Sequence, residues 1–142
     1  MLSRAQYVSI AAFRHQLRRF LSFSEAAANA AGLPAQQHQG LLAIAGHSGS
    51  APPTVGTLAD QLLIAPHTAA ELVSRMAEAG LITKTPSPTD RRRLHLTLTL
   101  KAAGLLAELT REHLTELDNL RTLLEDVAAK ITVSAGPPDR DE

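Results

Sequence analysis

The segment from Thr54 to Leu100 constrains the fold of this chain more than any other stretch of the sequence. Its first part contains two short runs in which apolar residues recur every three or four positions, and its last part alternates apolar and polar residues. The first spacing gives a helix one buried face, and the second gives a strand one buried face. The segment therefore predicts a pair of helices followed by a two-stranded hairpin, in a chain that is mainly α with a small β component (α+β).

The helix pair carries start and stop signals in both of its members. The first helix is predicted at 55–62, with Thr54 as its N-cap. After a three-residue turn, Pro66 stands at the first position of the second helix, where its missing N–H costs little. That helix is predicted to end at Glu78, because Gly80 can adopt the positive φ that follows many helices. Two short helices joined by so tight a turn form a helix-turn-helix.

The second helix of the pair has one apolar face and one polar face. Its polar face carries short side chains near the start and one arginine further along, which suits a helix that enters the major groove of duplex DNA. Arg75 is expected to read a guanine or to clamp a phosphate, while His67 either donates to the DNA or is simply solvated. The residues of this helix that are expected to contact DNA are Pro66, His67, Thr68, Glu71 and Arg75.

The hairpin that follows carries a cluster of arginines at its tip. Its first strand is predicted at 81–84, and its loop begins at Pro86 because proline cannot donate to a β-ladder. The second strand begins at Leu94, where leucines alternate with polar residues. The tip between the strands consists of Asp90, Arg91, Arg92 and Arg93.

Three adjacent guanidinium groups repel one another, so they require an anionic partner or water. The negative potential of a narrow minor groove attracts arginine. Arg92 is expected to enter that groove, held by a charge-assisted hydrogen bond to Asp90, while Arg91 and Arg93 face phosphates. A solvated basic loop is the alternative for an isolated arginine triplet, but the helix pair beside it favours DNA.

A helix-turn-helix followed by a basic hairpin is the layout of a winged helix-turn-helix. The segment contains, in order, the motifs Leu58-Ala59, Pro66-His67-Thr68, Leu72-Val73, Arg75, Gly80-Leu81-Ile82, Pro86-Ser87-Pro88, Asp90-Arg91-Arg92 and Leu98-Thr99. With these motifs the chain resembles the MarR family of bacterial transcription regulators. Asp90 and Arg92 fit the family's Asp-x-Arg hairpin pattern, whereas Ala65 and Ala102 stand where the family often has Ser and Gly.

The resemblance implies a regulator that binds a palindromic operator in double-stranded DNA as a homodimer. It implies a repressor that a small aromatic or phenolic effector releases, although the family also contains members without small-molecule control. All four aromatic residues lie within the first 23 positions, where they either line an effector pocket or belong to the dimer core: Tyr7, Phe13, Phe20 and Phe23. The effector-binding residues stay unassigned.

The residues outside the winged segment are predicted to form dimerisation helices. The N-terminal helix contributes Phe13, Leu17 and Phe20 from one stripe. The C-terminal helix has apolar residues at alternating steps of three and four, the spacing of a helix–helix seam: Leu117, Leu120, Leu124, Val127 and Ile131. A purely intramolecular helical bundle is the alternative use of these stripes. The predicted segments are 1–50 (dimerisation and supporting helices), 54–100 (winged segment), 101–133 (dimerisation helix) and 134–142 (flexible tail).

Composition narrows the possible functions further. Lysine and arginine together number 14, as do aspartate and glutamate, so attraction to DNA has to be local, and the stretch 84–93 holds four cations against one anion. There is no cysteine, which excludes disulfides and a thiol switch, and the six histidines lack metal-ligand spacing, so neither a metal nor a cofactor is expected. No phosphate loop or nucleophile elbow indicates an enzyme. Without a membrane span or signal peptide pattern, the protein is expected to be cytoplasmic.

One competing interpretation uses the same fold differently. A winged helix can serve as a protein–protein interaction module without DNA or effector binding, with the arginines meeting an acidic partner. Binding to duplex DNA with a steep salt dependence separates the two interpretations.

Overall fold

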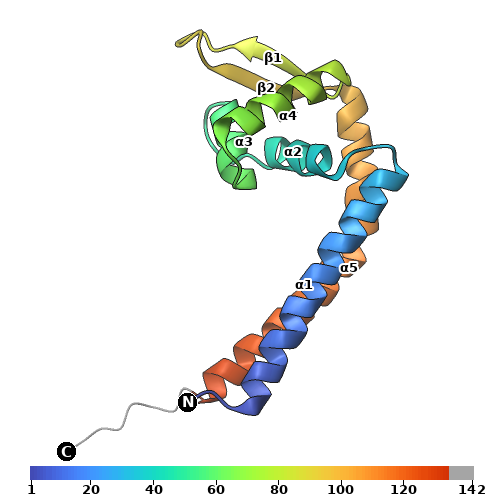
Figure 1. Ribbon diagram of the computed structural model, residues 1–142, viewed down its shortest axis with the longest axis vertical. Helices are drawn as coiled ribbons and strands as arrows, with labels where there is room; N and C mark the ends of the chain where they lie inside the picture. The colour runs from blue at the N-terminus through green and yellow to red at the C-terminus, as the bar shows by residue number, and fades with distance from the viewer. Residues whose placement is uncertain (135–142) are drawn as a thin grey trace, which may run out of the picture. The chain divides into compact units, whose positions relative to one another are not determined.

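The computed structural model describes the backbone of residues 1–134 and the side chains of residues 1–130. Its elements, labelled in Figure 1, are α1 (Arg4–Ala30), α2 (Ala35–Ala45), α3 (Val55–Leu62), α4 (Pro66–Glu78), β1 (Ile82–Pro86), β2 (Leu94–Leu98) and α5 (Leu100–Ser134). The mainly α fold with a two-stranded wing is confirmed, and both helices of the predicted pair have the predicted bounds. The predicted tail lies, apart from Ser134, outside the described residues.

The chain forms two compact units. We call residues 25–111 the winged unit, and residues 1–24 together with those from 112 onward the helical unit. The boundaries fall inside α1 and α5 rather than in loops, because different parts of a long helix can pack in two different units. None of the described helices carries a stretch long and apolar enough to span a membrane.

The winged unit has a closed apolar core to which every one of its elements contributes. α2 supplies Leu41, α3 supplies Leu58, and β2 supplies Leu96, each of them almost inaccessible to solvent. The predicted inward face of α4 is buried as expected and consists of Ala69, Leu72, Val73 and Met76. The first turns of α5 close the core with Ala102, Leu106 and Leu109.

Local signals fix the ends of α3 and α4. The side-chain oxygen of Thr54 accepts from the Thr57 N–H at 3.3 Å, and the Thr57 hydroxyl oxygen accepts from the Thr54 N–H at 3.2 Å. This reciprocal pair is a capping box that starts α3. Gly80 follows α4 with φ of 72°, as its position predicted.

The turn between α3 and α4 contains a residue in an unfavourable backbone conformation. Leu63 has φ of 55° and ψ of 44°, in the left-handed region that favours glycine. Its side chain is 92% exposed, so no packing compensates for this conformation. The turn geometry therefore sets the conformation of Leu63, and the side chain itself contributes little.

The two strands form an antiparallel hairpin in which Ile82 pairs with Leu98 and Pro86 pairs with Leu94. We call this hairpin, with its loop at 87–93, the wing. The first strand extends past the predicted 81–84 to include Pro86, because a two-stranded sheet consists of edge strands, where proline is tolerated. The other edge of β2 meets the segment before α3, since the Leu96 N–H donates to the Pro53 carbonyl at 2.9 Å.

The helical unit consists of an antiparallel helix pair, with the first turns of α1 beside the last turns of α5 (Figure 1). Near one end of the pair, the Ser9 hydroxyl lies 3.3 Å from Asp126 Oδ2 and donates to it. Near the other end, the rings of Phe20 and Phe23 meet the buried His113 ring edge-on, with centroids 5.7 and 5.2 Å away. The pair thus buries one stripe on each helix.

Candidate nucleic-acid interface

The polar face of α4 is turned to solvent in the winged unit. His67, Glu71 and Arg75 are exposed, Pro66 is exposed at the first helical position, and Thr68 is half-buried. The opposite face of the same helix is packed into the core, so the rotation of α4 about its axis is fixed. The five residues predicted on this helix therefore share an accessible surface that begins at its N-terminus.

The N-terminus of α4 has no side-chain cap. Ala65 makes no capping hydrogen bond to the first turn, and Pro66 has no N–H to satisfy. The remaining first-turn N–H groups and the positive end of the helix dipole can therefore face an anion. A phosphate is one of the anions that such a helix terminus binds.

Asp90 orders the tip of the wing. Its Oδ1 accepts from the backbone N–H of Arg92 at 3.1 Å and lies 3.5 Å from Arg92 Nε. The predicted hydrogen bond between these residues is present, but the donor is the backbone N–H rather than the guanidinium. The two side chains are 94% (Arg92) and 41% (Asp90) exposed, so their ion pair contributes little stability and acts mainly on orientation.

A buried serine, which the sequence analysis placed in a motif without assigning it a structural role, supports the same loop. The Ser87 hydroxyl oxygen accepts from the N–H groups of Thr89 and Asp90 at 3.3 and 3.4 Å. The Ser87 N–H donates to the Arg93 carbonyl at 2.8 Å, and the Arg93 N–H donates to the Asp90 carbonyl at 3.0 Å. The loop that carries the arginines is therefore closed by its own hydrogen bonds.

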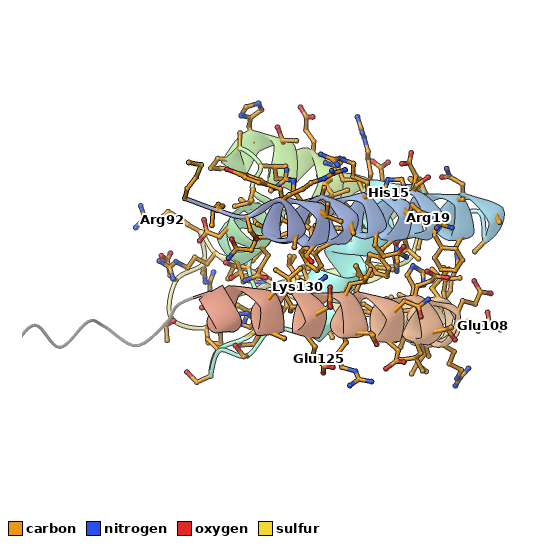
Figure 2. The ribbon with its side chains drawn as sticks, turned by 90° about the horizontal axis from the view of Figure 1, so that it is seen from below. His15, Arg19, Arg92, Glu108, Glu125 and Lys130 are labelled. Carbon is orange, nitrogen blue, oxygen red and sulfur yellow. The ribbon has the colours of Figure 1, made fainter. Side chains whose placement is uncertain are left out.

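The cations of the wing are all accessible. Lys84, Arg91, Arg92 and Arg93 are exposed, and Figure 2 shows the Arg92 side chain extending away from the ribbon. α4 and the wing share one core, to which α4 contributes Met76 and the strands contribute Ile82 and Leu96. The structure thus holds both predicted DNA-contact sets on the same compact unit.

The residues predicted for a dimer interface divide into two groups. Phe13, Phe20, Leu120 and Val127 are half-buried within the helix pair. Leu17, Leu117 and Leu124 are exposed, the last two by 43% and 53%. The side chain of Ile131 lies outside the described residues.

A charged face of α5 lies beside the exposed leucines. Arg121 Nη2 is 2.6 Å from Asp118 Oδ1, and its Nη1 is 3.2 Å from Glu125 Oε1. The hydrogen bond that the Arg121 guanidinium donates to Asp118, together with the charges of both carboxylates, raises the pKa of Arg121 above its ordinary value. Figure 2 shows Glu125 pointing away from α1, so the Glu125 side of this charged face is solvated in the single chain.

On the surface of the winged unit, an open groove of about 590 Å³ lies between α2, β2 and the first turns of α5. Its lining consists of Leu42, Ala45, Gly46, Leu98, Ala103, Leu106, Ala107 and Thr110. This volume is in the range of small-molecule sites. None of the four aromatic residues is among the lining residues, although the sequence offered them as candidates. Within residues 1–130, no group of three histidine or carboxylate side chains is placed to hold a metal ion.

Comparisons with known proteins bear on this geometry. Residues 31–93, which run from the turn before α2 to the tip of the wing, match the family model described as MarR family, so the resemblance inferred from the sequence is confirmed. A search of curated protein sequences finds no match.

Solved structures share the fold at low identity. AbsC, a MarR family transcriptional regulator from Streptomyces coelicolor, has a TM-score of 0.70 at 17% identity over 95% of this chain and 93% of its own. RV1404 from Mycobacterium tuberculosis has a TM-score of 0.67 at 22% identity over 99% and 100%. MepR from Staphylococcus aureus, in its complex with DNA, has a TM-score of 0.69 at 16% identity over 94% and 96%. At these identities the likeness shows the fold alone.

Proposed function

Because residues 31–93 match the MarR family model, we propose that this protein is a sequence-specific, double-stranded DNA-binding transcription regulator that acts as a homodimer. The observation that carries the proposal is the pairing of an exposed polar helix face with an ordered arginine loop on one core. The net charge of the chain is zero, so this local surface has to supply the attraction to DNA.

α4 is the recognition helix in this proposal. Its uncapped N-terminus approaches a phosphate, and its exposed side chains reach base edges in the major groove. Arg75 is in the last turn of α4, where it reads a guanine or contacts the backbone. Glu71, one turn earlier, accepts from a cytosine or orients Arg75.

The wing supplies contacts that do not depend on sequence. Asp90 directs Arg92 away from the hairpin, and an arginine so presented fits the negative potential of a narrow minor groove. Arg91 and Arg93 are then available to phosphates on either side. These contacts set affinity and register rather than base choice.

The dimer proposal is supported by the open apolar surface of the helical unit. Leu17, Leu117 and Leu124 remain exposed beside the buried stripes, and a second copy can cover them with the same residues about a two-fold axis. Two recognition helices related in this way fit successive major grooves about 10 bp apart, so the operator is an imperfect palindrome.

Control by a small molecule is the remaining part of the proposal. The open groove beside α5 suits a small ligand with an apolar ring, such as an aromatic or phenolic compound, because six of its eight lining residues are alanine or leucine. The Thr110 hydroxyl, which donates to the Leu106 carbonyl at 2.7 Å, can still accept a hydrogen bond from a phenolic ligand. In this proposal, ligand binding in the groove releases the protein from its operator. The protein is then a repressor that the ligand inactivates.

Selection of bound duplexes from a random pool tests the proposal. We expect an enriched palindrome, and affinity for it that falls steeply as salt rises because bound phosphates release counterions. Ligands are then screened for release of the enriched site. If no duplex is enriched at low salt, the proposal that the protein binds DNA is wrong, and the winged unit is a protein–protein interaction module.

A further inference from the structure

Two residues at the start of α5 hold the end of the recognition helix. Lys101 Nζ donates to the Ala79 carbonyl at 3.2 Å. The Thr99 hydroxyl donates to the Gly80 carbonyl at 2.7 Å, with the Leu81 carbonyl at 3.2 Å. The Thr99 N–H also donates to the Leu81 carbonyl, at 3.0 Å. Three consecutive carbonyls after α4 are therefore bound from one short stretch of the chain.

The Thr99 hydroxyl serves both helices at once. While it donates to the end of α4, its oxygen accepts from the Ala102 N–H at 3.2 Å and so caps the start of α5. The end of α4 carries partial negative charge and the start of α5 partial positive charge, so the hydroxyl dipole joins groups of opposite sign. Lys101 is unfavourable for the dipole of its own helix, but its ammonium group complements the end of α4.

These contacts are not needed to terminate α4. The helix already ends through its own backbone, since the Gly80 N–H donates to the Ala77 carbonyl and the Leu81 N–H to the Met76 carbonyl. The carbonyls that Thr99 and Lys101 bind lie one to three residues beyond the end of the helix. Their effect is thus to fix α4 relative to α5.

We propose that Thr99 and Lys101 are positioning residues for base recognition, which rests on the proposed DNA-binding function. They hold the C-terminal end of α4 and thereby the position of Arg75, whose carbonyl accepts from the Ala79 N–H at 3.0 Å. Base contacts depend on this position, because a hydrogen bond to a base edge tolerates little displacement. The wing arginines are held separately, by Asp90 and Ser87, and keep their contacts with the DNA backbone.

The decisive variant is Thr99→Val, which keeps the side-chain volume but removes the hydroxyl, with Thr99→Ser as the matched control that retains it. Dissociation constants are measured for the selected operator and for a random duplex at a temperature where circular dichroism shows full folding. Thr99→Val is expected to weaken operator binding by roughly tenfold, the order of one lost base contact, while random-duplex binding stays nearly constant. Thr99→Ser is expected to keep the wild-type ratio of the two constants.

Lys101→Met provides the second test, because Lys101 is exposed and its loss does not threaten the fold. Loss of charge alone lowers the affinities for the operator and for the random duplex equally. Loss of positioning instead lowers the ratio of operator affinity to random-duplex affinity. An unchanged ratio in folded Thr99→Val and in Lys101→Met overturns the proposal. If Thr99→Val does not fold, the ratio of operator affinity to random-duplex affinity in Lys101→Met decides whether the proposal holds. A wild-type protein that selects no duplex refutes the proposed function instead, so the two failures are distinct.

Discussion

The winged unit and the helical unit bury their apolar side chains to very different extents. In the winged unit, leucines from several elements converge on one closed core and are almost inaccessible. In the helical unit, two helices bury one stripe each, and Leu117 and Leu124 remain about half exposed. A pair of helices cannot enclose a core, so its outer apolar residues need another surface. The winged unit is therefore complete within one chain, while we expect the helical unit to be completed by a second.

The largest expected effect follows from the closed core of the winged unit. Leu58→Ala removes a side chain that is almost fully buried, so the free energy of unfolding should fall by about 2–5 kcal/mol. Leu100→Ala, at a fully exposed position of the same unit, should stay within roughly 0.5 kcal/mol of wild type. Urea denaturation measures the free energy of unfolding of both variants. Equal effects of the two variants would show that the core is not closed.

The next prediction tests the open surface of the helical unit. The double variant Leu117→Lys, Leu124→Lys should dissociate the dimer into monomers without unfolding the chain, because both positions are exposed in the single chain. Affinity for the palindrome should then fall by roughly a hundredfold, because a monomer binds one half-site and loses the gain in affinity from binding two half-sites at once. Binding to a single half-site should persist. Sedimentation and binding to both DNAs measure this.

Glu125→Lys is the matched control for that pair. It also adds positive charge to exposed α5, but on the solvated face beside Arg121, so dimer and affinity should be retained. A wild-type chain that sediments as a folded monomer at micromolar concentration, and binds one half-site as tightly as the palindrome, would falsify the dimer. The helical unit would then be an intramolecular bundle.

A smaller effect is expected at the wing. Arg92→Ala should weaken binding by roughly tenfold on every duplex and reduce the salt slope by about one unit, because the contact is with the groove and backbone. The thermal midpoint should stay constant, since the Arg92 side chain is almost fully exposed. Arg19→Ala removes an equally charged and exposed side chain from the far side of α1 relative to Leu17, and it should leave DNA binding unaltered. Near-wild-type affinity of Arg92→Ala at moderate salt contradicts the proposed minor-groove contact.

The bounds of α3 and α4 were predictable because their signals act within one turn of the chain. Thr54 caps the helix that it precedes, Pro66 fits the first helical position, and Gly80 adopts the positive φ that ends α4. Asp90 and Arg92 are likewise two positions apart. Where both partners of an interaction are close in sequence, their spacing alone identifies the contact.

The contacts that the sequence did not reveal join residues far apart in the chain. Thr99 binds a carbonyl 19 positions away, and His113 packs against Phe20 from the other long helix. The sequence places Ser87 in a loop and in the Pro86-Ser87-Pro88 motif but does not predict its burial, because that depends on how the wing folds back on itself. Likewise, steps of three and four identify the seam of α5 but not which of its leucines face α1 and which stay exposed.

The smallest predicted effect concerns strain in the turn before the recognition helix. Leu63→Gly should stabilise the protein by about 0.5 kcal/mol, because glycine removes a left-handed cost of about 1–2 kcal/mol but adds about 0.5–1 kcal/mol of chain entropy to the unfolded state. The exposed leucine side chain contributes no packing that the substitution would lose. Leu63→Ala is the control, since it removes the same side chain but keeps the Cβ that is strained at a φ of 55°. If thermal denaturation finds the glycine variant no more stable than the alanine variant, the turn is not strained and the winged unit is relaxed throughout its helix-turn-helix.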